Sequence, residues 1–244
     1  MEIANIYPIA NQKLYKNESF VMVLAHLIEQ YEASSFNVNS YVIMDNGLYE
    51  KAQVSTDIRK CIELADNCQL KVNEIIIPDV VNDPEATIEL FKKNLPYIEA
   101  NNDRYAFMFV AQAKTVEELN YMIMFINQFK HLNLTVGISK LSPIDRGCAE
   151  AIKVYQKCCF PIHFLGLKES FSELKHLKHL IRSCDSSQLA FMVKNKAYKE
   201  KGFDIIEYTR KGEDIDLAVD NCHQQLLQGL KTQLIFAKDI YGLL

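Results

Sequence analysis

Short, nearly continuous apolar runs recur along the chain and alternate with segments of helical periodicity. Seven of these runs have the length of a β-strand, at residues 20–25, 41–44, 74–77, 105–111, 134–138, 162–165 and 180–184. Strands that are buried on both faces of a parallel sheet lack the polar–apolar alternation of half-exposed strands. The pattern therefore predicts a parallel sheet covered by helices, with an eighth strand in residues 188–193 or 203–208.

Helix-start signals lie between several of these strands. Asp83 precedes Pro84, which places an N-cap residue before a proline at the first helical position. Related signals, two of them capping boxes, follow at residues 115–118, 142–145 and 170–173. Residues 216–244 have the pattern of one long amphipathic helix or of two shorter ones.

Strands that each precede a helix indicate right-handed crossovers, and 244 residues is close to the roughly 250 of one (β/α)8 barrel. The expected fold class is therefore α/β, a single (β/α)8 TIM-type barrel domain over residues 1–244 with a C-terminal helical segment. A doubly wound open sheet is the alternative, but it usually carries a glycine-rich phosphate loop after its first strand. Here His26-Leu27-Ile28 follows that strand, which favours the barrel.

Composition limits the compartment and the partners. Seven cysteines form no regular framework, which favours free thiols in a reducing, cytoplasmic compartment. No apolar run approaches the roughly 18 residues that span a membrane, so no membrane partner is expected. The net charge is −4, yet residues 168–201 hold eight Lys or Arg against four Asp or Glu, a local balance of +4. Such a patch can bind phosphates, although on charge alone a solvated lysine-rich helix face is favoured.

Polar side chains follow most of the predicted strands. In a (β/α) barrel the residues directly after each strand line the active-site face. By this rule the candidate positions are His26, Asp45, Asp79, Gln112, Gly166, Leu167 and Asp185. Carboxylates gathered at one end of a barrel suit acid–base and nucleophilic chemistry. Structural roles are the alternative, because Asn46-Gly47 is a strong turn signal and Asp185 is placed to cap a helix or an Asx-turn.

Five segments, in this order along the chain, resemble motifs of the tRNA-guanine transglycosylase superfamily. Residues 42–50 are similar to its Asp-Ser-Gly-Gly-Phe-Gln stretch, and more similar to the Asp-Asn-Gly-Ala-Phe-Glu form of the DNA-modifying branch. Residues 77–80 fall where the family has an aspartate that contacts the base, and residues 110–112 resemble its Val-Gln-Gly motif. Residues 164–167 resemble its Gly-Gly-Leu motif, and residues 182–187 its Gly-Ile-Asp motif. The resemblance covers residues 21–187 and is closest to the DNA-guanine transglycosylases of phages and of bacterial 7-deazaguanine DNA-modification clusters.

The resemblance implies base exchange, in which guanine in a polynucleotide is replaced by a free 7-deazaguanine. It assigns Asp185 as the nucleophile that forms a covalent glycosyl-enzyme, and Asp45 as the general acid/base. The implied base-binding set is Asp79, Gln112, Gly166, Leu167 and His26, and the phosphate-binding set is Lys194, Lys196 and Lys199. No cofactor beyond the 7-deazaguanine co-substrate is implied, and a phage-encoded protein of this kind would act in the cytoplasm of its host.

The chain departs from the tRNA-modifying enzymes in two places. It has one glycine, Gly47, where they have two, and after Asp185 only Cys222 and His223 could correspond to their Cys-x-Cys-x2-Cys…His zinc site. A structural zinc needs four ligands, so none is expected, and DNA is favoured over tRNA as the partner. A tRNA-guanine transglycosylase and an inactive barrel that binds a nucleobase or a protein are the alternatives. An aldolase or isomerase barrel is disfavoured, because no lysine or metal-ligand set is expected at the strand ends.

Overall fold

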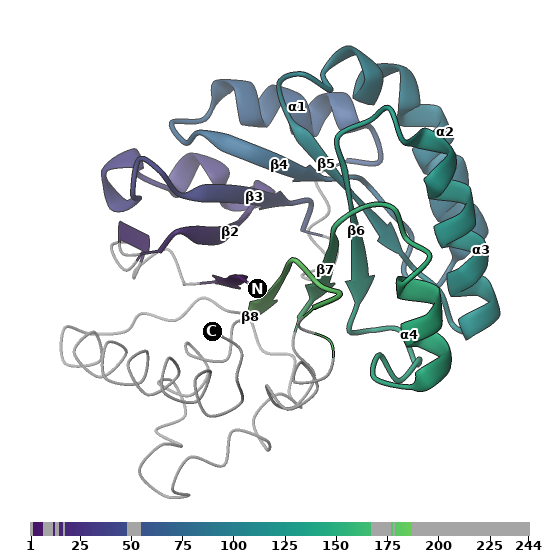
Figure 1. Ribbon diagram of the computed structural model, residues 1–244. Coiled ribbons are helices and arrows are strands. Elements are labelled where there is room, and N and C mark those ends of the chain that lie inside the picture. The colour runs from purple at the N-terminus through teal and green to yellow at the C-terminus, as the bar shows by residue number, and fades with distance from the viewer. Residues whose placement is uncertain are drawn as a thin grey trace, which may run out of the picture.

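The strands of this protein form a closed barrel. The computed structural model describes residues 2–6, 12, 15–16, 18–47, 55–166, 177 and 179–186. Eight parallel strands follow one another around the barrel in chain order (Figure 1). They are β1 (Glu2–Asn5), β2 (Phe20–Leu24), β3 (Tyr41–Asp45), β4 (Val72–Ile76), β5 (Ala106–Ala111), β6 (Leu134–Ser139), β7 (Ile162–Leu165) and β8 (Ser183–Ser186). The predicted TIM-type barrel is thus confirmed.

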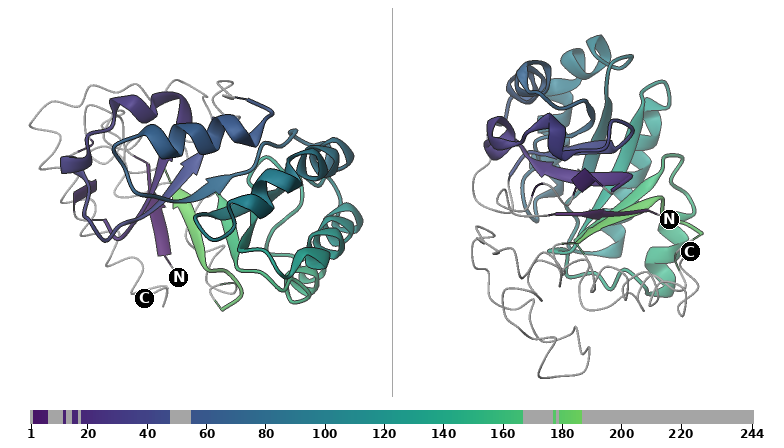
Figure 2. Two further views of the ribbon diagram at one scale, coloured as in Figure 1. Left: turned by 90° about the horizontal axis from the view of Figure 1, so that it is seen from above. Right: turned by 90° about the vertical axis from the view of Figure 1, so that its left-hand side faces the viewer.

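The eighth strand is not where the apolar pattern placed it. The barrel is closed at the N-terminus by β1, which pairs with β8 through Ala4 and Asp185 and with β2 through Asn5 and Val21. Figure 2 shows β1, in purple, beside β8, in light green. The expected eighth strand at residues 188–193 or 203–208 was therefore wrong, and both ranges lie outside the described residues. The four residues of β1 include a glutamate and an asparagine, so they make no apolar run.

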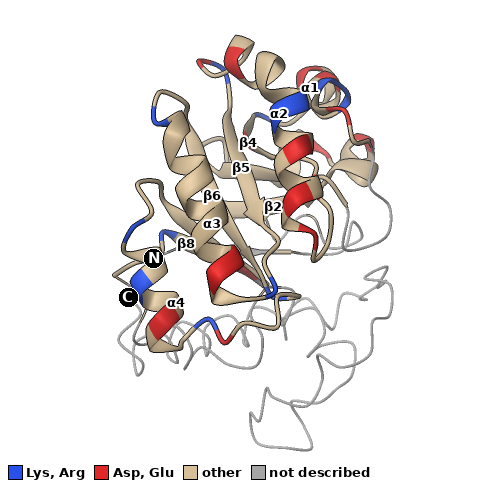
Figure 3. Cartoon of the chain, turned by 90° about the vertical axis from the view of Figure 1, so that its right-hand side faces the viewer, with Lys and Arg blue, Asp and Glu red and all other residues tan. Residues whose placement is uncertain are grey.

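In the part of the chain that the structure describes, four α-helices cover the outside of the barrel around β4 to β7 (Figure 1). They are α1 (Ile58–Asn67), α2 (Pro84–Ala100), α3 (Val116–Ile126) and α4 (Ala149–Tyr155), with 3-10 helices η2 (Ala25–Gln30), η3 (Ala33–Ser35) and η4 (Asn127–Phe129). Figure 3 shows charged residues along these helices, whereas β5 and β6 carry none. Among the described helices none is both long and apolar enough to cross a membrane.

Two of the predicted helix starts are confirmed and one is not. The Asp83 side chain accepts from the Ala86 N–H at the start of α2, and Thr115 forms a complete capping box with Glu118 at the start of α3. The helix expected at residues 142–145 begins later, at Ala149. The Ser142 hydroxyl instead donates to the Ala113 carbonyl, so it holds a turn and caps no helix. The starts expected at residues 170–173 and 216 lie outside the described residues.

Apolar side chains pack in two layers separated by the wall of the barrel. The larger layer lies between the strands and the helices and includes Val42, Ile75 and Phe109. The smaller one fills the inside of the barrel and includes Met22, Ile43, Ile76, Met108 and Val110. Because successive residues of a strand point to opposite faces, the alternate positions of β4, β7 and β8 also face inward, and several of these are polar.

The six cysteines in the described part of the chain are free thiols, as expected. Burial raises the pKa of Cys61 and of Cys158 to about 11. Since the thiolate is the reactive form, these two side chains behave as small packing groups. Cys222 lies outside the described residues.

Candidate active site

A buried carboxylate joins the ends of three neighbouring strands. Asp79 lies just beyond β4 and is 4% exposed. Asn46, which directly follows β3, donates from Nδ2 to Asp79 Oδ1 at 3.1 Å and to the Ile77 carbonyl at 3.2 Å. Gln112, which directly follows β5, donates from Nε2 to Asp79 Oδ2. We call Asn46, Asp79 and Gln112 the amide–carboxylate cluster.

The environment of Asp79 changes its acidity. Burial raises its pKa to about 6, and the hydrogen bonds from Gln112 and Asn46 oppose that rise because they stabilise the charged form. A carboxyl group with this pKa changes charge near neutral pH. Shifted pKa values of this kind are typical of functional sites, although structural networks also produce them.

Asp45 ends β3 immediately before this cluster. Its Oδ1 accepts a hydrogen bond from the Gly47 N–H at 3.1 Å, and Gly47 has a φ of +79°. This is the Asx-turn that the Asn-Gly signal indicated. By strand alternation Asp45 shares the inner face of the barrel with Ile43. The turn therefore ends the strand, and it also places the Asn46 side chain within hydrogen-bond distance of Asp79.

A second carboxylate lies between β7 and β8. Asp185 is part of β8 and 6% exposed. Its Oδ1 accepts from the Gly166 N–H at 2.7 Å and lies 3.2 Å from Nε2 of His163, which is completely buried. Gly166 has a φ of +66°, a conformation that glycine adopts at no steric cost. The expectation that Asp185 follows its strand was wrong, because β8 begins three residues later than the apolar run.

The structure brings four of the predicted site residues together as two pairs and places His26 apart from them. Asp79 and Gln112 are directly hydrogen-bonded, and so are Asp185 and the Gly166 backbone. His26 is separate from both pairs: it is exposed on η2 and lines an open pocket of about 370 Å³ together with Lys60 and Leu64 of α1. Leu167, Lys194, Lys196 and Lys199 lie outside the described residues. The catalytic and binding roles of all these residues stay predictions.

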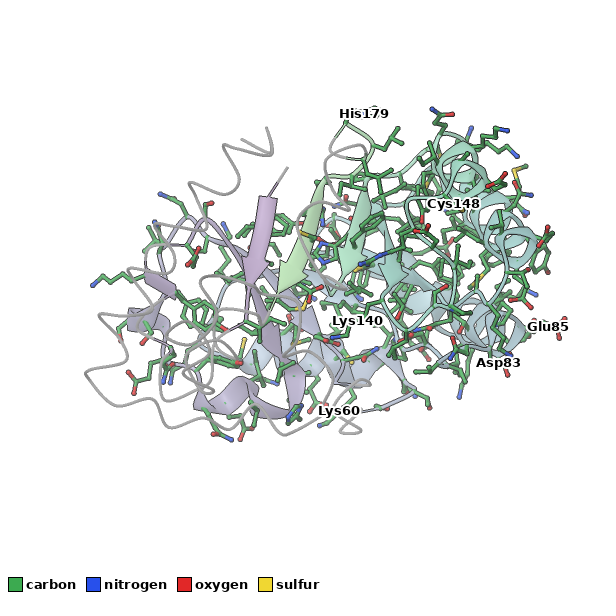
Figure 4. All side chains as sticks on the ribbon, turned by 90° about the horizontal axis from the view of Figure 1, so that it is seen from below. Lys60, Asp83, Glu85, Lys140, Cys148 and His179 are labelled. Carbon is green, nitrogen blue, oxygen red and sulfur yellow. The ribbon has the colours of Figure 1, made fainter. Side chains whose placement is uncertain are left out.

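Two basic residues that the strand-end rule did not select lie beside Gly166. Arg146 is 1% exposed, donates from Nη2 to the Gly166 carbonyl at 2.9 Å and stacks 4.6 Å from the centre of the Phe164 ring. Lys140 follows β6 directly, and its side chain crosses the place where a Cβ on Gly166 would lie. Figure 4 shows Lys140 toward the middle of the molecule and Asp83 and Glu85 at its edge.

The expectation that no lysine follows a strand was therefore wrong. The strand-end rule would have found Lys140 if the apolar run 134–138 had been extended by the one polar residue, Ser139, that completes β6. His163 and Arg146 had no such signal, since one lies within a strand and the other in a turn. Among the residues that the structure describes, no group of three or more His, Cys, Asp or Glu is arranged to hold a metal ion.

No protein-family model matches the chain, and no curated protein matches it in sequence. Solved structures match in fold. An oxaloacetate acetylhydrolase in complex with 3,3-difluorooxalacetate gives a TM-score of 0.53 at 7% identity, covering 99% of this chain and 92% of that one. An HpcH/HpaI aldolase from Desulfitobacterium hafniense DCB-2 gives 0.48 at 10% identity, covering 87% and 94%. At 7% identity the likeness to the acetylhydrolase shows the barrel fold alone and leaves the resemblance to transglycosylases untested.

Proposed function

We propose that this protein is a guanine transglycosylase, which replaces guanine in a polynucleotide with a free 7-deazaguanine through a covalent aspartyl–glycosyl intermediate. The observation that carries the proposal is the amide–carboxylate cluster at the carboxyl ends of β3, β4 and β5, where barrel enzymes bind their substrates. The resemblance of the motifs around Asp45, Asp79, Gln112, Gly166 and Asp185 supports it independently.

The cluster suits the edge of a guanine-type base. That edge presents two neighbouring N–H donors and one carbonyl acceptor. An ionised carboxylate accepts hydrogen bonds only, whereas an amide side chain both donates and accepts. Asp79 would accept from the two N–H groups, and the Gln112 amide would donate to the carbonyl once it releases Asp79. Asn46 would keep the carboxylate oriented during this exchange of partners.

The chemistry falls to the two remaining aspartates. An oxygen of Asp185 would attack C1′ of the target nucleotide while the C1′–N9 bond breaks, and Asp45 would give a proton to the departing guanine. Asp45 would then remove a proton from the incoming 7-deazaguanine, whose nitrogen attacks C1′ as the C1′–O bond to Asp185 breaks. The proton balance closes over one turnover, and the reaction consumes no cofactor.

We favour DNA as the polynucleotide over tRNA. After Asp185 the sequence has two Cys or His residues, Cys222 and His223, whereas the zinc site of the tRNA-modifying enzymes needs four ligands. Residues 42–50 are also most similar to the DNA-modifying form. A target base inside a duplex must be flipped out before its sugar can be attacked. Lys194, Lys196 and Lys199 are the candidates for holding the phosphates.

The deciding experiment measures incorporation of a labelled base into plasmid DNA and into bulk tRNA, side by side. Wild type should label DNA, and Asp185→Ala should label neither, whereas Asp103→Asn, at an exposed turn residue, should behave as wild type. Label in tRNA alone would overturn the DNA preference and keep the enzyme class. Label in neither polymer, with correctly folded protein, would favour the inactive nucleobase- or protein-binding barrel.

One observation favours a second candidate function. Lys140 stands at the end of β6 beside Gly166, and a lysine at a barrel strand end can form a Schiff base with a carbonyl substrate. Borohydride reduction in the presence of a panel of 2-oxo acids, followed by peptide mass spectrometry, tests this function. A reduced adduct on Lys140, absent from Lys140→Met, together with no base exchange would replace the transglycosylase proposal.

A further inference from the structure

A continuous chain of hydrogen bonds crosses the inside of the barrel beneath Asp185. His163 Nδ1 lies 2.8 Å from the Ser183 hydroxyl, and the same hydroxyl accepts from Arg182 Nε at 3.1 Å. Arg182 also donates to Thr135 Oγ1 at 3.0 Å and to Glu74 Oε2 at 2.8 Å. His163, Ser183 and Glu74 are fully buried and Thr135 is 1% exposed. Because His163, Ser183, Thr135 and Glu74 are buried, their hydrogen-bond partners within the protein determine where each proton lies.

The hydrogen bonds of this network run in one direction, from Arg182 through Ser183 and His163 to Asp185. A guanidinium has donors and no acceptor, so the Ser183 oxygen accepts a hydrogen bond from Arg182 Nε–H, and its own hydroxyl proton is free to point at His163 Nδ1. In the neutral imidazole an accepting Nδ1 leaves the proton on Nε2. That proton then points at Asp185 Oδ1, at 3.2 Å. The Gly166 N–H donates to the same oxygen at 2.7 Å.

We propose that His163 is a positioning residue for Asp185, fixed in its Nε2–H tautomer by Ser183 and Arg182; this rests on the proposed role of Asp185 as the nucleophile. Both hydrogen bonds to Asp185 that come from described residues reach Oδ1, which leaves Oδ2 as the oxygen that attacks C1′. When Oδ2 forms the bond, the electron pair for it comes from the carboxylate, and Oδ1 becomes the ester carbonyl. When the incoming base breaks that bond, the charge returns to the carboxylate, and the two N–H donors stabilise it.

Three variants separate positioning from folding. His163→Leu replaces the imidazole by an apolar side chain of similar bulk and so removes the hydrogen-bond donor to Asp185. His163→Gln can place an amide N–H near the position of Nε2. Ser183→Ala leaves the imidazole in place and removes the hydroxyl that fixes its proton on Nε2. All three are compared with wild type for thermal stability before activity is measured, so that a misfolded variant is recognised.

The activity readout is the formation and breakdown of the covalent enzyme–DNA adduct in a single turnover. Loss of one preorganised donor costs about 100-fold in rate at comparable sites. His163→Leu should therefore slow breakdown of the adduct about 100-fold, because the charge that the donor stabilises returns to Asp185 in that step, and it should slow formation only as far as Asp185 loses its orientation. His163→Gln should recover part of this loss, and the affinity for the free base should stay at its wild-type value because Asp79 and Gln112 bind it. Wild-type rates in His163→Leu would overturn the positioning role while base exchange itself stands.

Nitrogen-15 NMR of the imidazole gives a readout that needs no activity. Wild type should show a protonated Nε2 with a slowly exchanging proton, and Ser183→Ala should show a mixture of tautomers. If wild type neither exchanges bases nor forms an adduct, the transglycosylase proposal fails and this spectrum decides the positioning role alone. An Nε2–H signal then supports it, and an Nδ1–H tautomer or a freely exchanging ring overturns it.

Discussion

Arg182 Nη2 lies 2.8 Å from Oε2 of Glu74, which is 108 residues away in the chain and completely buried. The Tyr41 hydroxyl donates to the same oxygen at 2.9 Å, and the guanidinium lies 5.5 Å from the ring centres of both Phe20 and Tyr41. Burial and the charge of Glu74 together raise the pKa of Tyr41 well above its usual range. This ion pair connects β4 to the residue just before β8 through the inside of the barrel.

Removing the arginine should destabilise the fold strongly. Arg182→Met leaves the Glu74 carboxylate buried without its cation, and breaking a buried pair in this way costs about 3–5 kcal/mol. The double variant Glu74→Gln/Arg182→Met removes both charges and should regain part of that loss. Urea denaturation of the three proteins measures the difference. A free energy of unfolding for Arg182→Met within about 1 kcal/mol of wild type would show that the pair is not structural.

Asp79 should make the protein less stable as the pH rises. Its pKa is about 6 in the folded chain and about 3.9 in an unfolded one. Between these values the folded state binds more protons, so the free energy of unfolding falls as the pH rises through this window, by about 3 kcal/mol at most. Asp79→Asn lacks this titration. Its stability relative to wild type should therefore improve from pH 4 to pH 7; a constant difference would mean that Asp79 titrates normally.

Base binding should depend on the same ionisation. If the charged Asp79 accepts the two N–H groups of the base, affinity for 7-cyano-7-deazaguanine should rise with pH through the pKa of about 6 and level off once Asp79 is fully ionised. Asp79→Asn should bind about 10- to 100-fold more weakly, the loss of one hydrogen bond to a charged group, with no such pH dependence. Calorimetry between pH 5 and pH 8 tests this, with Asp103→Asn as the control. Equal affinities of wild type and Asp79→Asn at pH 7 would show that Asp79 does not bind the base.

A side chain at Gly166 should destabilise the fold. Its φ of +66° costs an L-residue about 1–2 kcal/mol, and a Cβ would collide with the Lys140 side chain. Gly166→Ala should therefore be destabilised and should also move the N–H that holds Asp185, which lowers the rate of adduct formation. Gly147→Ala is the matched control, because its Cβ would meet Asp145 Oδ1 at an ordinary 3.5 Å. Equal stability of the two alanine variants would contradict the conformational requirement at Gly166.

Phosphate binding should show in the salt dependence of DNA affinity. With about four to six phosphate contacts, the log–log slope of affinity against salt should be roughly −4 to −5 on duplex DNA. Replacing Lys194, Lys196 and Lys199 together by Gln should flatten this slope and leave the affinity for the free base unchanged. Fluorescence anisotropy at four salt concentrations measures it. An unchanged slope would move the phosphate contacts to another part of the chain.

The sequence by itself determined much of the scaffold. Buried parallel strands are read from short apolar runs, and seven runs lie on or within a few residues of seven strands of the barrel. The caps at Asp83 and Thr115 were also predictable, because a cap is a contact between residues three apart in the chain. The strand-end rule found Asp79 and Gln112 for the same local reason, since each follows its own strand.

The tertiary structure alone decided which of these groups meet. The polar strand β1 gains its place by pairing with β2 and β8 at the closing seam, and no pattern within four residues signals that pairing. His163, in the middle of an apolar run, reads as a core residue until strand alternation turns it inward and β8 brings Asp185 to it. Glu74 and Arg182 lie in runs that the apolar pattern assigns to two separate strands, and nothing in either run signals that the two charges pair. Contacts across a barrel depend on strand register and closure, which are properties of the whole chain, so no single segment encodes them.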